Sequence, residues 1–349
     1  MYKLDNKIIE DLKKIKKEKG FENLYLYLSN ECDYHCKHCY LGDRLVKKEF
    51  MEVQQAKKYL ETFKQLGSEK VCFIGGEPTL YSGLEECVDY AVELGYKKII
   101  VGSNGSSKAS EILLQIKDKV SYIQISLDGA TRESNDYIRN KGAYDQTIDT
   151  IKSLVDANID TRIIMTVNSV NVNEVLNMID LGSKLKVQLV KFHIMSEIGN
   201  AKISNIKGVS PEKWIETCNL IQQYTLANKK IKVSYQPAYA IKGNSDSYLE
   251  KYQGCVGKNL ERISVFPDGK CYICSFLFDF GIYYAEQNNN CLIKCKNSEY
   301  DYFTENRCDS CDSRCGYDGC VAEDIVTGGR TCLNSSNIYP VCRLWKVEI

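Results

Sequence analysis

Residues 24–40 read LYLYLSNECDYHCKHCY, and this stretch indicates how the chain folds. Its first part, Leu24–Ser29, is a short apolar run that predicts a β-strand followed by a turn. Cys32, Cys36 and Cys39 come directly after it, in a C-x3-C-x2-C spacing. Three thiols placed so closely are typical of a loop that folds around one metal centre. We therefore expect a metal site immediately after the first strand.

Beyond this stretch, strand-like runs alternate with helical periods, which predicts parallel strands joined by crossover helices. The other expected strands are Lys70–Ile74, Lys97–Gly102, Tyr122–Leu127, Arg162–Val167 and Leu189–Ile194. The expected helices are Val53–Leu66, Leu84–Leu94, Ile112–Ile116, Thr147–Leu154 and Val175–Leu185. Together they predict an α/β fold of the open, partial (β/α)6 barrel type, in which ligands bind at the carboxyl ends of the strands.

The composition indicates the cellular compartment in which the protein works and the kinds of partner that it lacks. The 349 residues include 46 basic and 46 acidic side chains, so the chain lacks the basic excess typical of nucleic-acid binding. The sequence shows neither a secretory signal pattern nor a run of ~18 apolar residues, and we expect a cytoplasmic protein with no membrane partner. Cytoplasmic thiols stay reduced, so the 17 cysteines favour metal binding or catalysis over disulfides.

The cysteines also predict how the chain is divided. Eleven of the 17 lie from Cys255 onward, where segments become short, polar and rich in glycine and asparagine. Such a segment buries little apolar surface, and metal clusters are a usual way to stabilise it. The expected parts are an N-terminal helix at 1–22, a partial barrel at 23–235, a linker at 236–254 and a cysteine-rich domain at 255–349.

The chemistry of the first cysteine group leaves two alternatives. Three thiolates are one fewer than a [4Fe–4S] cubane needs, which leaves one iron open to an exogenous ligand. A zinc site would instead take a fourth protein ligand, which His35 or His38 could supply. The cysteines in apolar segments are expected to be small core residues; they are Cys72, Cys87 and Cys218.

With His38 in its aromatic position, the C-x3-C-x-φ-C loop resembles the signature of the radical S-adenosylmethionine (SAM) family. Three turns match that family in the same order along the chain. Gly75–Pro78 follows the second strand, Ser103–Gly105 the third and Ser126–Gly129 the fourth. The resemblance covers residues 20–235.

This resemblance implies cofactors and a reaction. SAM would complete a [4Fe–4S] cluster held by Cys32, Cys36 and Cys39. An electron from an external donor of the flavodoxin or ferredoxin type would pass through that cluster and cleave SAM to a 5′-deoxyadenosyl radical, which abstracts hydrogen from a substrate. The residues implied in SAM binding are His38, Gly75, Gly76, Glu77, Ser103, Asn104, Ser126, Asp128 and Arg139.

The C-terminal cysteines are similar to the SPASM extension of radical SAM enzymes that modify peptides. Cys255, Gly269 and Cys274 match its first half, whereas the spacing around Cys315 and Cys320 departs from it. The resemblance implies two auxiliary [4Fe–4S] clusters. Their implied ligands are Cys255, Cys274 and Cys320 for the first cluster, and Cys308, Cys311, Cys315 and Cys342 for the second.

Some of these ligand assignments stay open. The fourth position of the first auxiliary cluster is Cys271, Cys291, Cys295 or an open iron. In the second cluster, Cys332 could replace Cys342. The alternative to both clusters is a pair of zinc ribbons whose C-x2-C pairs are Cys271/Cys274 and Cys308/Cys311.

The same resemblance implies a ribosomally made peptide as substrate, which gains a thioether, a C–C cross-link or a related oxidative change, with a leader peptide held by a separate protein. Sulfatase-maturing relatives carry an aspartate where this chain has Ser275, which argues against that activity. Two further functions stay open: a small-molecule carbinol dehydrogenase and a non-catalytic iron–sulfur or zinc scaffold. His193 is either a pocket residue or a core histidine, and the expected proton acceptors are Glu197, Asp279 and Asp318.

Overall fold

The computed structural model describes residues 21–241, 254–257, 259–278, 280–288, 291–294, 338–344 and 346–349. The expected N-terminal helix at 1–22 and most of the expected linker at 236–254 lie outside these ranges. The expected site residues that also lie outside the described residues are Asp279, Cys295, Cys308, Cys311, Cys315, Asp318, Cys320 and Cys332.

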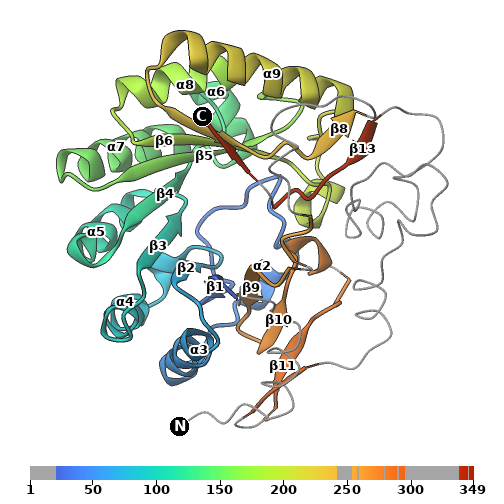
Figure 1. Ribbon diagram of the computed structural model, residues 1–349. Helices are drawn as coiled ribbons and strands as arrows, with labels where there is room; N and C mark the ends of the chain where they lie inside the picture. The colour runs from blue at the N-terminus through green and yellow to red at the C-terminus, as the bar shows by residue number, and fades with distance from the viewer. Residues whose placement is uncertain are drawn as a thin grey trace, which may run out of the picture.

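In the described part of the chain, seven parallel strands that follow one another in chain order form an open sheet (Figure 1). All their carboxyl ends therefore meet at one edge, and the expected α/β fold with a partial barrel is confirmed. The six expected strands are all present, with ends within two residues of the expected ones. The strands are β1 (Asn23–Tyr27), β2 (Lys70–Ile74), β3 (Lys98–Ser103), β4 (Tyr122–Ser126), β5 (Thr161–Val167), β6 (Leu189–Ile194) and β7 (Lys232–Tyr235).

Helices pack on the outer face of this sheet (Figure 1). They do so through apolar side chains spaced three and four apart; α3, for example, buries Ala56, Leu60 and Phe63. The longer helices are α3 (Val53–Gln65), α4 (Leu84–Glu93), α5 (Ser107–Gln115), α6 (Arg132–Ile138), α7 (Ala143–Asp156), α8 (Val175–Lys184) and α9 (Pro211–Asn228). The shorter turns are α2 (Arg44–Lys47), η1 (Pro78–Leu80), η2 (Lys117–Lys119), η3 (Val172–Glu174), η4 (Gly199–Lys202) and η6 (Ser275–Leu277).

Two helices, α6 and α9, are not apparent from the apolar period of the sequence. The α6 sequence, RESNDYI, is mostly polar, and the helix begins where the Thr131 side chain accepts a hydrogen bond from the Ser134 N–H. Similarly, Ser210 caps α9 by accepting from the Lys213 N–H, one residue before a proline in the first turn. Capping and tertiary contacts form these helices, so a search for one apolar stripe misses them.

The cysteine-rich part continues the same sheet. Strand β9 (Arg262–Val265) lies parallel to β1, with Ile263 opposite Leu24. On the other side, β14 (Val347–Glu348) pairs antiparallel with β7. Both edges of the seven-stranded array are thereby covered, which removes two edges prone to pairing with other chains. The antiparallel extension beyond β9 consists of β10 (Lys270–Tyr272), β11 (Ala285–Asn288) and β12 (Cys291–Lys294), and a separate small sheet joins β8 (Tyr239–Ile241) to β13 (Ile338–Pro340).

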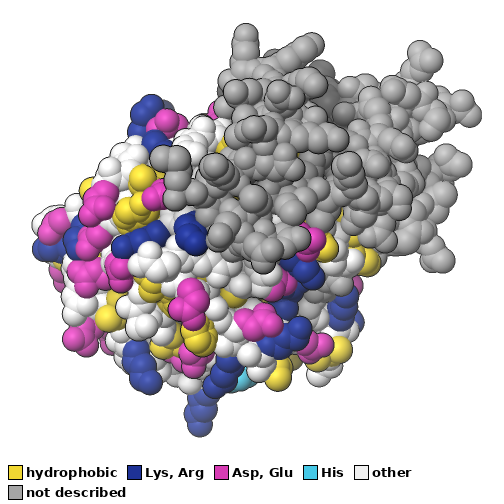
Figure 2. Space-filling view, turned by 90° about the horizontal axis from the view of Figure 1, so that it is seen from below, with side chains coloured by type: hydrophobic (Ala, Val, Ile, Leu, Met, Phe, Trp, Pro, Cys, Tyr) yellow, Lys and Arg dark blue, Asp and Glu magenta, His cyan; other side chains and the backbone are white. Residues whose placement is uncertain are grey.

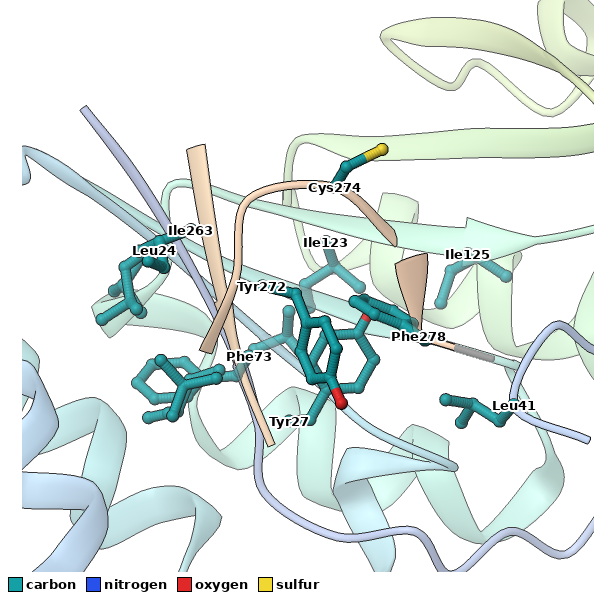
Figure 3. Packing of buried hydrophobic residues seen from close by; sticks show 14 of the residues in the cluster. Leu24, Tyr27, Leu41, Phe73, Ile123, Ile125, Ile263, Tyr272, Cys274 and Phe278 are labelled. Carbon is teal, nitrogen blue, oxygen red and sulfur yellow. The ribbon is translucent and has the colours of Figure 1, made fainter. Parts of the chain in front are cut away.

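An aromatic cluster fastens β9 and β10 to β1. The Tyr27 ring stacks on Phe266, with centroids 4.0 Å apart and an interplanar angle of 13°. Phe278 meets Phe266 edge-on at 4.4 Å, and Tyr272 lies 4.8 Å from Phe278 (Figure 3). Such pairs contribute about 0.5–1.5 kcal/mol each beyond their burial. The cysteine-rich part is thus packed directly against the first strand of the barrel.

The described surface mixes basic and acidic side chains. Figure 2 shows no continuous patch of one sign on the described part of the face it presents, in keeping with the zero net charge by count. Surface ion pairs such as Lys57–Glu86 and Arg132–Asp145 contribute to this mixture. Within the described ranges, no helix is both long and apolar enough to cross a membrane.

We expect Ile263→Ala to lower the free energy of unfolding by ~2–5 kcal/mol, because Ile263 is 1% exposed on β9 and its truncation leaves a cavity beside Leu24. Urea unfolding followed by circular dichroism under anaerobic conditions measures this change. The control Val46→Ala removes a side chain that is 80% exposed and should change stability by less than ~0.5 kcal/mol. Equally small effects for both variants would mean that β9 is not an integral strand of the sheet.

Candidate active site

The loop that carries Cys32, Cys36 and Cys39 leaves the carboxyl end of β1, as the sequence predicts. The loop turns tightly, because the Cys39 N–H donates to the Cys36 carbonyl at 3.2 Å and the Gly42 N–H donates to the Cys39 carbonyl at 3.3 Å. The three residues are half-buried and their thiols are free. They therefore lie at the edge where the parallel strands end.

The three thiols lie in one loop and influence one another electrostatically. Burial raises the pKa of Cys32 and of Cys36 to about 12, and that of Cys39 to about 11. Cys36 further raises the pKa of Cys32, Cys39 that of Cys36, and Cys32 that of Cys39, so the sulfurs interact with one another. Three buried thiolates so close together would be unfavourable without a positively charged group among them. Among the described residues, no three His, Cys, Asp or Glu side chains converge on a single metal ion.

The segment after β6 clamps the cysteine loop. The Asn200 backbone N–H donates to the Cys39 carbonyl at 2.9 Å, and its side-chain amide donates to the Cys36 carbonyl at 3.1 Å. Gly199 precedes it with φ +58°, and a Cβ there would lie 2.4 Å from the Cys39 carbonyl oxygen. Only glycine fits this position. The Gly-Asn pair predicts a tight turn here, but no local pattern indicates that the turn contacts the cysteine loop.

Two glycines press the turn after β2 against the same loop. A Cβ on Gly75 would lie 2.3 Å from the Ser29 carbonyl oxygen, and one on Gly76 would lie 2.1 Å from that of Glu31. The Gly76 N–H donates to the Ser29 carbonyl and the Glu77 N–H donates to the Glu31 carbonyl, both at 2.7 Å. The glycines are thus required for backbone-to-backbone packing beside the cysteines.

The Glu77 carboxylate is engaged inside the protein. It accepts hydrogen bonds from the Thr79 hydroxyl at 2.8 Å, the Ser103 hydroxyl at 2.9 Å and the Asn104 N–H at 2.6 Å. Burial raises its pKa, which the hydrogen bond from Asn104 opposes. The Asn104 amide in turn donates to Asp33 in the cysteine loop at 2.6 Å. Glu77 and Asn104 therefore connect the turns after β2 and β3 to the cysteine loop.

A buried ion-pair group centres on Asp128, which follows β4. The Arg139 Nε donates to its Oδ2 at 2.6 Å, the His38 Nε2 lies 3.1 Å from the same oxygen, and the Thr166 N–H donates to its Oδ1 at 2.7 Å. Burial opposes ionisation of Asp128, but Arg139, followed by His38, outweighs it and holds the pKa of the carboxyl well below its usual range. Asp128 is therefore ionised and joins α6, β5 and the cysteine loop.

The remaining expected site residues differ in their burial and in their hydrogen-bond partners. Ser126 is half-buried at the carboxyl end of β4. Glu197 is exposed after β6, and its Oε1 accepts a hydrogen bond from the Gly208 N–H at 2.8 Å. His193 is half-buried on β6, and its Nε2 has no hydrogen-bond partner. The other two expected proton acceptors, Asp279 and Asp318, lie outside the described residues.

Four of the expected auxiliary-cluster cysteines are described, and all are buried. The exposed fraction is 6% for Cys255, 0% for Cys271, 4% for Cys274 and 2% for Cys342. The Cys255 sulfur would lie 3.7 Å from a Cβ placed on Gly257. The expected core cysteines are buried as well, as predicted: Cys72, Cys87 and Cys218. The two auxiliary clusters themselves stay a prediction.

These observations define an α/β protein with an open parallel sheet and a three-thiol loop held by glycine turns at the carboxyl edge. Residues 26–182 match the family model described as the Radical SAM superfamily. This part of the chain is therefore similar to the Radical SAM superfamily, whose members use a [4Fe–4S] cluster and SAM.

Proteins of similar sequence bear different names. The Fe-coproporphyrin III synthase of Methanosarcina barkeri is 28% identical over 201 residues, which are 57% of this chain and 50% of that protein. The probable GTP 3′,8-cyclase of Saccharolobus islandicus is 26% identical over 266 residues, which are 74% of this chain and 84% of the cyclase. The match thus spans half the length of the synthase, and the two names do not agree on a substrate.

Solved structures share the fold over most of the chain. SuiB of Streptococcus suis, bound to its precursor peptide SuiA, has a TM-score of 0.67 at 20% identity, covering 96% of this chain and 78% of SuiB. The enzyme anSMEcpe with bound AdoMet has a TM-score of 0.58 at 16% identity, covering 83% of this chain and 86% of anSMEcpe. At these identities the likeness concerns the fold.

The residues at the carboxyl edge fit the cofactors that the superfamily uses. Three thiols in one short loop suit a [4Fe–4S] cluster that keeps one iron for an external ligand. The buried His38 Nδ1 has no hydrogen-bond partner, so a polar atom next to Cys39 is left for a bound molecule. His38 Nε2 is paired with Asp128, which fixes how the ring points. Ser126 is half-buried at the carboxyl end of β4, at the same edge of the sheet.

We expect Asp128→Asn to lower the free energy of unfolding by ~3–5 kcal/mol, because it leaves the guanidinium of Arg139 buried without its counter-ion. Urea unfolding of the parent and the variant measures the difference. Asp145→Asn is the matched control: it breaks the exposed pair with Arg132, and its effect should lie within experimental error. A variant at position 128 as stable as the parent would contradict the central role of this carboxylate.

Proposed function

We propose that this protein uses SAM and a [4Fe–4S] cluster to modify a ribosomally made peptide oxidatively. The observation that carries the proposal is the loop that holds Cys32, Cys36 and Cys39 at the carboxyl end of β1, against which the backbone of Gly75 and Gly76 packs closely. Three thiols leave one cluster position for an external ligand, which a purely structural metal site does not need.

In this proposal, Cys32, Cys36 and Cys39 hold the cluster. When bound, the cluster and SAM together supply the 5′-deoxyadenosyl radical that abstracts hydrogen from the substrate. The chain's own residues bind and orient: the backbone at Gly75 and Gly76 receives the SAM amino group. The other residues proposed to surround SAM are His38, Glu77, Ser103, Asn104, Ser126, Asp128 and Arg139.

We also propose that the cysteine-rich part, residues 255–349, holds two auxiliary [4Fe–4S] clusters. They would accept an electron from the substrate radical, which makes the overall change an oxidation. The burial of Cys255, Cys271, Cys274 and Cys342 supports this assignment, because buried thiols can ligate clusters away from water. A reduced flavodoxin or ferredoxin would supply the electron for SAM cleavage.

The peptide substrate is supported by the likeness to SuiB, whose structure contains the precursor peptide SuiA. The second candidate is a small molecule, favoured by the relatives named for GTP and for Fe-coproporphyrin III. Sulfatase maturation is not proposed, because Ser275 replaces the aspartate of those enzymes. As proton acceptor we propose Glu197 among the described residues, since it is exposed at the carboxyl edge after β6.

Cys36→Ala should abolish formation of 5′-deoxyadenosine, because the cluster loses one of its three thiolates. The measurement is anaerobic reconstitution with iron and sulfide, incubation with SAM and dithionite, and quantification of 5′-deoxyadenosine by chromatography. The C-terminal clusters should persist in this variant.

Cys87→Ala is the matched control, since Cys87 is fully buried on the core side of α4 and its replacement should leave the yield unchanged. Normal SAM cleavage by the variant at position 36 would refute the ligand assignment. A fully iron-loaded parent protein that forms no 5′-deoxyadenosine would favour the non-catalytic scaffold.

Iron and sulfide content of the anaerobically purified protein tests the number of clusters. We expect ~12 irons per chain, as three [4Fe–4S] clusters require. A content of ~4 irons would leave only the cluster of the first loop. Zinc found by X-ray absorption in tetrahedral sulfur coordination would support the ribbon alternative for the C-terminal part.

A further inference from the structure

The face of the sheet turned away from the helices has its own small cluster of side chains. Cys72, Ile100 and Tyr122 are buried there, apart from the main core, and Tyr25 packs against them. Gln124 belongs to the same face, since its Nε2 lies 3.9 Å from the Cys72 sulfur. We call this the inner face. It is the face that a partial barrel encloses.

A lysine crosses this inner face. Lys191 on β6 is only 7% exposed, and its Nζ donates to the Gln124 Oε1 on β4 at 2.7 Å, past the intervening strand β5. Burial, followed by repulsion from Lys70, lowers the pKa of Lys191 to about 8. A buried ammonium group is unfavourable unless a counter-ion or hydrogen-bond acceptor compensates it. We therefore expect such a group near Lys191.

Other cations adjoin Lys191. After burial, Lys191 is the side chain that most lowers the pKa of Lys346, so the two cations lie near each other. Lys70 and Arg262 also act on Lys346 and, together with burial, lower its pKa well below the usual range. Within the described part of the chain, none of these four side chains lies within ion-pair distance of a carboxylate. Among the described residues, therefore, no carboxylate is ion-paired with these cations of the inner face.

Two acidic groups near this region already have partners, and a third, Glu348 on β14, is exposed. Asp128 is the carboxylate that acts on His193, but it is paired with His38 and Arg139. Asp160 is likewise paired with Arg162, at 2.7 Å. Neither carboxylate can balance the lysines without giving up its own partner.

Three polar atoms on the same side have no hydrogen-bond partner: the Arg262 Nε, the Ser264 Oγ and the His193 Nε2. Ser264 is fully buried and lies opposite Tyr25 in the register of β9 and β1. The Arg262 guanidinium stacks on the Tyr25 ring at 3.7 Å, so both residues of β9 face inward. Buried polar atoms are rarely left without partners unless a bound molecule completes them.

We propose that Lys191, Lys346 and Arg262 form a binding site for an oxyanion of the substrate, either a carboxylate or a phosphate group. Ammonium and guanidinium groups bind both through charge-assisted hydrogen bonds, and the Ser264 hydroxyl adds a neutral donor. Assigning this oxyanion to the substrate rests on the proposed function.

The proposed site lies on β6, the strand whose following segment contacts the three-thiol loop. His193 is two residues beyond Lys191, so its side chain is on the same face and about 7 Å nearer the carboxyl edge. After His193 the chain leads into the segment whose Gly199 and Asn200 clamp the cysteine loop. A substrate anchored at Lys191 would extend past His193 toward that loop.

The test is isothermal titration of the full-length, iron-loaded protein without SAM, using succinate, inorganic phosphate and the neutral analogue succinamide. We expect saturable binding of at least one oxyanion and none of succinamide. Stronger binding of succinate would indicate a carboxylated substrate, and stronger binding of phosphate a phosphorylated one. Lys191→Met and Lys346→Met should each weaken that binding about tenfold or more.

Lys108→Met is the matched control, since Lys108 is exposed on α5 in the outer layer and its loss should leave the affinity unchanged. Thermal unfolding of each variant shows whether it folds. If Lys191→Met does not fold, the affinity of Lys346→Met, at the edge of the sheet, tests the site instead. Absence of binding by either oxyanion, or unchanged affinity in both folded variants, overturns the site. The titration omits SAM, so it tests the oxyanion site independently of SAM cleavage. If the parent protein binds an oxyanion but forms no 5′-deoxyadenosine in the cleavage assay, only the proposed function is overturned.

Discussion

The carboxyl edge of this protein depends on one buried carboxylate. Asp128 is shielded from water and accepts hydrogen bonds or ion pairs from Arg139, from His38 and from the Thr166 N–H. An isolated carboxylate in that position would be unfavourable by several kcal/mol, so it requires the Arg139 guanidinium and its hydrogen-bonding partners. Since these partners come from α6, the cysteine loop and β5, the three segments can reach their places only together.

Backbone contacts reinforce this arrangement from two other directions. Gly75 and Gly76 bring the turn after β2 within hydrogen-bonding distance of the backbone before Cys32, and Gly199 does the same after β6 for the carbonyl of Cys39. A side chain at any of the three positions would meet a carbonyl oxygen. The three thiols are therefore held by contacts that no flexible side chain can replace, which suits a site that must present three sulfurs to one cofactor.

The two faces of the sheet differ in chemistry because they have different neighbours. The outer face packs against helices and is apolar, as at Leu24 and Ile263. The inner face is enclosed by the sheet itself, and it carries Lys191 and Gln124. The strands β9 and β14 close the two edges of the array, and β14 follows directly after Lys346. The cysteine-rich part thus shapes the site as well as extending the sheet.

Local patterns in the sequence were sufficient for the strands β1–β6, for the amphipathic helices and for the order of the turns after them, because period and glycine placement act over a few residues. The pairing of β9 with β1, the internal use of the Glu77 carboxylate and the meeting of His38 with Asp128 were decided only in the folded chain. Each joins residues far apart in sequence, and no local pattern specifies which distant partner a strand edge or a buried charge will find. The helix α6 shows the same limit, since its polar sequence becomes a helix through a cap at Thr131 and the burial of Arg139 just after its end.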